Sequence, residues 1–115
     1  AAKARLLIDE LRSDRIRIVL DAANLFETAS IDDQRRIVSG AIDRLAGHMA
    51  MAHAKDRDAS GEFVAAGKGV LDYQHYLARL TAAGFDGPLV THGLAAEQAP
   101  EVAQFLRRSL AQAVP

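Results

Sequence analysis

Three short apolar runs, each followed by a segment of helical periodicity, constrain the fold of this chain more than any other feature. The runs at 16–20, 49–52 and 88–91 are rich in apolar residues and do not alternate between polar and apolar side chains. Such runs are typical of strands buried on both faces of a parallel sheet. They recur at the spacing of βαβ units, about 30 residues or more. The sequence therefore predicts an α/β fold built from parallel βα units.

Residues with capping chemistry indicate where the intervening helices begin and end. Ser30 and the acidic Asp33 resemble a capping box at the start of one helix, and Gly47 stands where that helix is expected to stop. Asp72 is placed to cap the next helix, and Gly84 to end it. Two further helices are expected, one at 1–11 and one that begins between 97 and 100.

Length, charge and composition exclude several classes of protein. The 115 residues suffice for one domain but not for two, and the net charge of −1 disfavours a phosphate-rich partner, so we expect no nucleic-acid partner. The chain has no cysteine, which excludes disulfides and thiolate zinc sites. No apolar run approaches the roughly 18 residues of a membrane helix, and no signal-peptide pattern opens the chain. We expect a cytoplasmic protein without membrane contact.

Each predicted strand ends at a residue that can bind a metal ion: Asp21, His53 and His92. In parallel α/β folds the carboxyl ends of neighbouring strands meet at one mouth, where chemistry collects. One carboxylate and two imidazoles suit a divalent transition ion such as Zn, Mn, Co or Fe(II). Each residue alone is equally compatible with a structural role, because an Asp after a strand often caps a helix and a lone His is more often a core residue.

The segment 53–58 concentrates charge directly after the second strand. A solvated loop is the simplest interpretation, but at the mouth of a barrel Lys55 offers a point charge and Arg57 a planar fork for a carboxylate or phosphate. Farther along, Gly67 and Gly69 would allow the backbone to approach a ligand closely. His48, ahead of its strand, and His75, on a helix, are expected to be structural or exposed.

The motifs of these segments resemble the xylose isomerase-like TIM-barrel family, the sugar phosphate isomerase/epimerase group that also contains AP endonucleases. The resemblance covers nearly the whole chain and rests on VLDAANLF at 19–26, MAHAKDRDASGEFVAAGKGVLD at 51–72 and GPLVTHGL at 87–94. It implies that residues 1–115 form a single segment matching the last three βα units of an eight-unit (β/α)8 TIM barrel, hence a fragment of a longer domain.

The same resemblance implies roles for single residues. Asp21 and His53 match metal ligands of the family, which uses a divalent ion such as Mn, Co, Zn or Mg. Arg57 matches an Arg that binds substrate hydroxyls or phosphate. His92 stands where the family has a Glu that both binds metal and shuttles a proton, and Asn24 stands where many members have a His.

These residues support more than one hypothesis about function. The first is a metal-dependent sugar or sugar-phosphate isomerase or epimerase that works through an enediolate, with His92 as ligand or acid/base and with Asn24, Lys55 and Arg57 as substrate contacts. The second is a non-catalytic or truncated barrel fragment. An AP endonuclease-type nuclease is disfavoured, because its three-zinc site needs more ligands than are visible and a basic surface for the duplex.

Three strands with helices on one face also leave the inner face of the sheet bare. We expect several strand side chains to be partly open to water: Ile16, Ile18, Leu20, Met49, Met51 and Leu89. Such a surface calls for a partner, so the chain is expected either to form a homo-oligomer or to pack against the remainder of a barrel.

Overall fold

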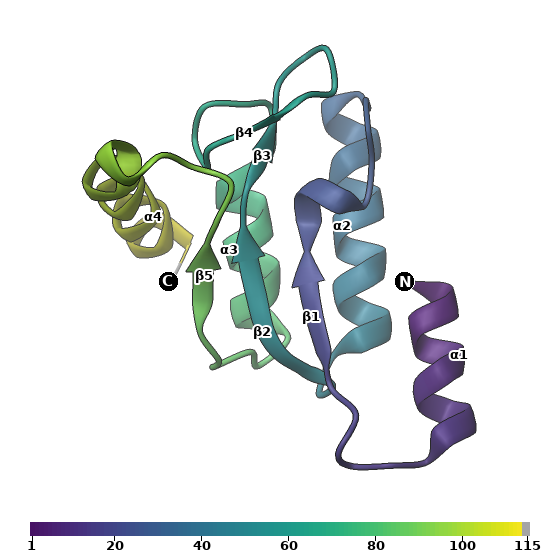
Figure 1. Cartoon of the computed structure of the whole chain (residues 1–115). Coiled ribbons are helices and arrows are strands. Elements are labelled where there is room, and N and C mark those ends of the chain that lie inside the picture. The colour runs from purple at the N-terminus through teal and green to yellow at the C-terminus, as the bar shows by residue number, and fades with distance from the viewer. Residues whose placement is uncertain (114–115) are drawn as a thin grey trace.

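A computed structural model describes residues 1–113 (Figure 1). The four α-helices are α1 (Ala2–Leu11), α2 (Ile31–Leu45), α3 (Tyr73–Ala82) and α4 (Ala99–Ala113). The five strands are β1 (Ile18–Asp21), β2 (Met49–Ala54), β3 (Asp56–Arg57), β4 (Phe63–Val64) and β5 (Leu89–Thr91), and two 3-10 turns, η1 (Ala22–Asn24) and η2 (Ala96–Gln98), follow β1 and β5.

The main sheet is parallel and three-stranded, in the order β1-β2-β5. Helices α2 and α3 cover its rear face in the view of Figure 1, with α1 beside α2 and α4 beside α3. The apolar residues of α2 and α3 pack against small residues of β2: Val38, Ile42, Tyr76 and Leu77 are buried in one cluster with Ala52 and Ala54. The predicted α/β fold of parallel βα units is confirmed.

The helix ends follow the predicted capping chemistry. The Ser30 hydroxyl accepts a hydrogen bond from the Asp33 amide, and the Asp72 carboxylate accepts one from the His75 amide, so both helices begin at their predicted caps. Gly47 and Gly84 follow the ends of α2 and α3 with φ values of +81° and +78°, a conformation that glycine adopts without strain.

All three strands differ from the prediction at their boundaries, and the third does so only by beginning at Leu89 rather than at residue 88. The first strand covers 18–21 rather than 16–20, and the second continues to Ala54, so that His53 lies within β2 rather than after it. The second strand extends because its register continues: Asp21 pairs with His53, and His53 with Val90. Apolar runs alone understate a strand whose last residues face a polar site.

The prediction of a solvated loop after β2 is wrong in part. This segment contains an antiparallel hairpin of β3 and β4 that rises above the main sheet (Figure 1). The turn between them is closed by Asp58, whose carboxylate accepts hydrogen bonds from the Ser60 and Glu62 amides. Arg57 lies opposite Phe63 in the hairpin.

The front face of the sheet carries no helix in the part of the chain that the structure describes (Figure 1). Val19 on this face is 49% exposed. The expected exposure of Leu20 and Met49 is wrong, since both are buried in the core cluster. The other strand residues expected to be partly open to water are so: Ile16, Ile18, Met51 and Leu89. Within residues 1–113, no helix has both the length and the apolar character needed to cross a membrane.

Candidate functional site

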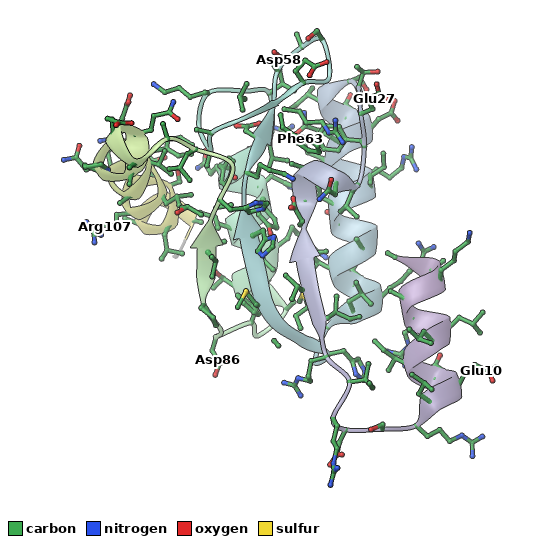
Figure 2. All side chains as sticks on the ribbon, in the orientation of Figure 1. Glu10, Glu27, Asp58, Phe63, Asp86 and Arg107 are labelled. Carbon is green, nitrogen blue, oxygen red and sulfur yellow. The ribbon has the colours of Figure 1, made fainter. Side chains whose placement is uncertain are left out.

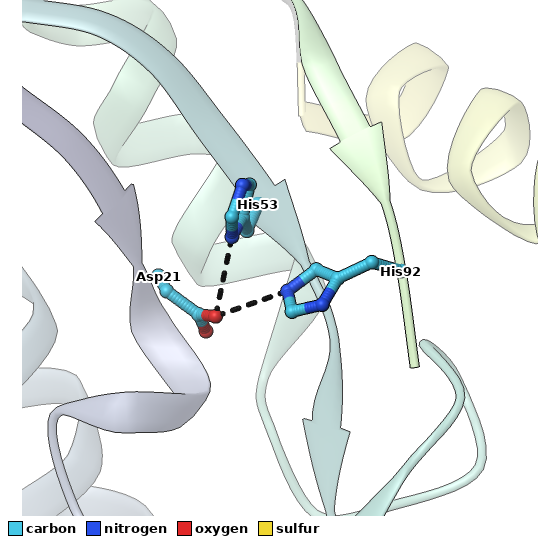
Figure 3. A group of neighbouring side chains, drawn as sticks. All are labelled: Asp21, His53 and His92. Carbon is cyan, nitrogen blue, oxygen red and sulfur yellow. Dashed lines mark hydrogen bonds and ion pairs between the residues drawn. The ribbon is translucent and has the colours of Figure 1, made fainter. Parts of the chain in front are cut away.

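The carboxyl ends of the three parallel strands bring Asp21, His53 and His92 together, as predicted. Asp21 is the last residue of β1 and pairs in register with His53 on β2, so their side chains leave the same face of the sheet. His92 follows β5 and lies two residues beyond Val90, the partner of His53, which returns its side chain to that face. Figure 3 shows both imidazoles directed at the Asp21 carboxylate.

Three side-chain nitrogen atoms surround one carboxylate oxygen of Asp21. Its Oδ2 lies 3.2 Å from His92 Nε2, 3.4 Å from His53 Nδ1 and 3.4 Å from Lys55 Nζ. The two imidazole rings are themselves in edge contact, with centroids 4.3 Å apart. The potential ligand atoms of the three residues all lie within 4.8 Å of one another.

The electrostatics of the site favour an ionised Asp21. Burial alone would raise the pKa of this carboxyl, but the Lys55 ammonium and the hydrogen bonds from His92, Lys55 and His53 outweigh burial and lower the pKa. The side chains of Asp21 and Lys55 are each only 10% exposed, whereas that of His92 is 40% exposed. The site therefore has a buried Asp21–Lys55 ion pair at its base and the His92 imidazole at its open side.

Two tyrosines of α3 hold the backbone that carries the site. The Tyr76 hydroxyl donates to the carbonyl of His53 at 3.1 Å, and the Tyr73 hydroxyl donates to the carbonyl of Lys55 at 2.7 Å. Burial raises the pKa of both phenols well above the usual value, so both remain donors. Their helical spacing predicts that the two rings pack between helix and sheet. Their hydrogen bonds to the backbone at His53 and Lys55 join residues far apart in the sequence, so no local pattern predicts them.

The predicted substrate contacts occupy different surroundings. Lys55 is part of the Asp21 cluster, whereas Asn24 is exposed at the end of η1. Arg57 donates from Nε to the carbonyl of Ala23 and from Nη1 to that of Gly61, both at 2.6 Å. Arg57 thus connects the turn after β1 with the turn of the hairpin.

Phe63 is a residue of the site that the sequence did not indicate (Figure 2). Its ring centroid lies 3.6 Å from Lys55 Nζ and 3.9 Å from the Arg57 guanidinium carbon. The signal that locates it is the Asp58–Gly61 turn, which folds β4 back on β3 and sets Phe63 against Arg57. The hairpin thereby brings an aromatic face to both cations.

The Gly67–Gly69 segment binds a carboxylate of the chain itself, which corrects its interpretation as an approach to a ligand. Asp56 is fully buried, and its two oxygens accept hydrogen bonds from the amides of Gly67, Gly69, Leu71 and Arg57. A Cβ at Gly69 would lie 2.0 Å from the Arg57 carbonyl oxygen, so glycine is required there. Asp56 is therefore a structural residue rather than part of a solvated charge run.

Two other histidines lie away from the cluster, as predicted. His75 Nε2 lies 2.8 Å from the Ser39 hydroxyl, between α3 and α2. His48 precedes β2, at the end of the sheet opposite the site.

The residues present fit a divalent metal ion. One carboxylate and two imidazoles are donors that Zn, Mn or Co accepts. Within residues 1–113, Asp21 Oδ1 is buried and has no hydrogen-bond partner, which leaves a carboxylate oxygen with its lone pairs unused. A buried acceptor in that state is expected at a site that takes a cation.

A family model described as xylose isomerase-like TIM barrel matches residues 1–109. No curated protein matches the chain.

Two solved structures are similar in fold. An L-ribulose 3-epimerase superposes with a TM-score of 0.65 at 20% identity, over 97% of this chain and 42% of that one. A xylose isomerase domain protein from Planctomyces limnophilus gives a TM-score of 0.66 at 23% identity, over 94% of this chain and 44% of that one. The chain thus spans less than half the length of these proteins, and its sheet corresponds to part of a barrel.

Proposed function

Because the chain belongs to the xylose isomerase-like TIM-barrel family, we propose that it is the C-terminal part of a metal-dependent isomerase or epimerase of small sugars or sugar phosphates. The observation that carries this proposal is the convergence of Asp21, His53 and His92 from three adjacent strand ends, beside a buried carboxylate oxygen without a partner. The mouth of the barrel is where enzymes of this architecture perform their chemistry.

The bare front face supports the proposal that the three βα units are the last three of an eight-unit barrel. The exposed Val19 and the two edges of the β1-β2-β5 sheet, which are unpaired within residues 1–113, need cover. The remaining strands of a barrel, or a second copy of the chain, would supply it.

In the proposed site, Asp21 and His53 hold a divalent ion such as Mn, Co, Zn or Mg. A bound ion would supply a Lewis acid that polarises a carbonyl and its neighbouring hydroxyl. His92, the most exposed of the three residues, either completes the ligand set or carries the proton between adjacent carbons of the substrate, which passes through an enediolate.

Three further residues are proposed to bind the substrate. Lys55 presents its ammonium beside Asp21, and Arg57 has two donors fixed by backbone carbonyls, which orients its planar guanidinium. Asn24, exposed at the end of η1, offers its amide to a substrate hydroxyl. The ligand-poor site and the net charge of −1 disfavour a nuclease, and we propose that the partner is a small molecule rather than a nucleic acid.

The presence of His92 where the family has a Glu favours one alternative, a barrel that keeps the fold without the chemistry. Metal analysis separates the two. His53→Ala in the full chain is expected to remove both bound metal and turnover of a panel of ketoses and ketose phosphates, while His75→Ala leaves both unchanged. A parent protein that binds no ion at micromolar metal supports the non-catalytic alternative, and unchanged metal content in His53→Ala contradicts the site.

A further inference from the structure

Lys55 is a buried cation inside the proposed metal centre. It follows the last residue of β2, its side chain is 10% exposed, and its Nζ lies 3.4 Å from the Asp21 oxygen to which both imidazoles point. A lysine is rarely buried to this degree, because its ammonium loses hydration that a single shared carboxylate restores only in part. Its position therefore needs an explanation beyond packing.

The surroundings of Lys55 fix the ammonium in place. The Tyr73 hydroxyl binds the Lys55 carbonyl at 2.7 Å, and the Phe63 ring centroid lies 3.6 Å from Nζ. Phe63 is held in turn by pairing with Arg57 in the hairpin. With an aromatic face on one side and Asp21 on the other, Nζ stays at the centre rather than extending into water.

Lys55 and Arg57 place two cations on the ring of Phe63, and the nearby Asp56 carboxylate is occupied by backbone amides. Within residues 1–113, Asp21 is the only carboxylate within ion-pair distance of Lys55, and none lies within that distance of Arg57. The single carboxylate is also shared with His53 and His92. A divalent ion at Asp21 would place further positive charge close to the Lys55 ammonium.

We propose that Lys55 is a fixed cation that weakens metal binding at Asp21 and in return binds an oxyanion beside the metal. The oxyanion would be a phosphate, a carboxylate or the developing enediolate oxygen of the substrate. Like charges a few ångströms apart in a partly buried site repel, whereas an anion there is attracted by the metal and the ammonium together. This inference rests on the proposed metal centre and assigns Lys55 the selection of a negatively charged ligand.

The test uses two probes with opposite expected responses. In the full chain, Lys55→Met is expected to tighten Mn²⁺ or Zn²⁺ binding about tenfold and to weaken inorganic phosphate binding to the metal-loaded protein about tenfold. Lys55→Arg, which keeps the charge, should leave both dissociation constants within about threefold. Lys68→Met is the matched control, because Lys68 pairs with Glu101 on the surface and should change neither constant. Titration calorimetry measures both.

The opposite signs distinguish this role from a structural one. If Lys55 only supports the site, its loss weakens metal and phosphate binding together, and that result overturns the inference. Unchanged constants in Lys55→Met overturn it as well, while the metal centre still stands. If neither parent nor variant binds metal, the proposed function fails with it. A neutral Lys55→Gln variant must reproduce the result of Lys55→Met, and a difference between them counts against a charge effect.

Discussion

The Nε2 atom of His92 lies 3.2 Å from the Oδ2 atom of Asp21, although 71 residues separate them in the chain. This contact exists because β1 and β5 flank β2 and their carboxyl ends lie at the same end of the sheet. Asp21 is therefore the point at which all three strands of the sheet are tied together by side chains.

Asp21→Asn is expected to destabilise the chain by about 3 kcal/mol, because it leaves the buried Lys55 ammonium without its counter-ion. Chemical denaturation measures the change. The double variant Asp21→Asn with Lys55→Met should recover part of the loss, since no buried charge then remains unpaired. Additive losses in the double variant would show that the two residues do not interact.

Gly69→Ala is expected to cost about 2 kcal/mol or more of unfolding free energy, because the new Cβ would lie 2.0 Å from the Arg57 carbonyl oxygen. Gly40→Ala provides the matched control. Gly40 lies within α2 and has nothing within 4 Å of an added Cβ, so alanine there should stabilise the chain by about 0.5–1 kcal/mol. Equal melting temperatures for the two variants would contradict the proposed close approach.

Asp72 predicts a defined pH dependence of stability. Burial alone would raise the pKa of its carboxyl, but the His75 amide and the Arg35 guanidinium lower it below the usual value. A carboxyl with a lowered pKa in the folded state adds stability above its unfolded pKa, about 4, and loses it as the pH falls through the folded value. Asp72→Asn should therefore be about 0.5–1 kcal/mol less stable at pH 7 and match the parent near pH 2. A difference that persists in acid would point to the cap rather than the charge.

For the proposed isomerase or epimerase activity, Arg57→Lys is expected to raise the KM for the ketose or ketose phosphate substrate about tenfold or more. The reason is that an ammonium cannot donate to both the Ala23 and Gly61 carbonyls while facing a ligand, and bonds to charged groups contribute about 1.5–3 kcal/mol. Steady-state kinetics measure the change. A KM within twofold of the parent value would limit Arg57 to joining the two turns.

Residues 1–115 alone are expected to self-associate at micromolar concentration. The front face of the sheet presents the exposed Val19 in the part of the chain that the structure describes, and both sheet edges are unpaired. Sedimentation velocity tests this expectation. A compact, cooperatively folding species of 12.4 kDa would contradict it.

Local chemistry was enough to predict the helix ends, because Ser30, Asp72 and Gly47 act on atoms a few residues away. The strand ends were predicted for a similar reason, since parallel strands must bring their carboxyl ends to one edge. Asp21, His53 and His92 follow from that rule without any knowledge of side-chain geometry.

The burial of Asp56 and the position of Phe63 could not be predicted in the same way. The amides that bind Asp56 belong mainly to residues 11 to 15 positions later, and their approach depends on a turn whose shape no periodicity encodes. Strands of two residues, such as β3 and β4, carry no repeat to detect. Judged by residue type alone, the charged segment 53–58 resembles a solvent-exposed loop.

Asp56 fills a nest of amides as a bound anion would, except that the neighbouring strand supplies it. Residues 63–72 therefore do not form a self-sufficient module. Their shape depends on a carboxylate that comes before them in the chain, and a protein engineer who transplants this loop onto another barrel must transplant Asp56 as well. Without it, the transplanted loop would carry three unsatisfied amides, those of Gly67, Gly69 and Leu71, and its turn would lack the anion that closes it.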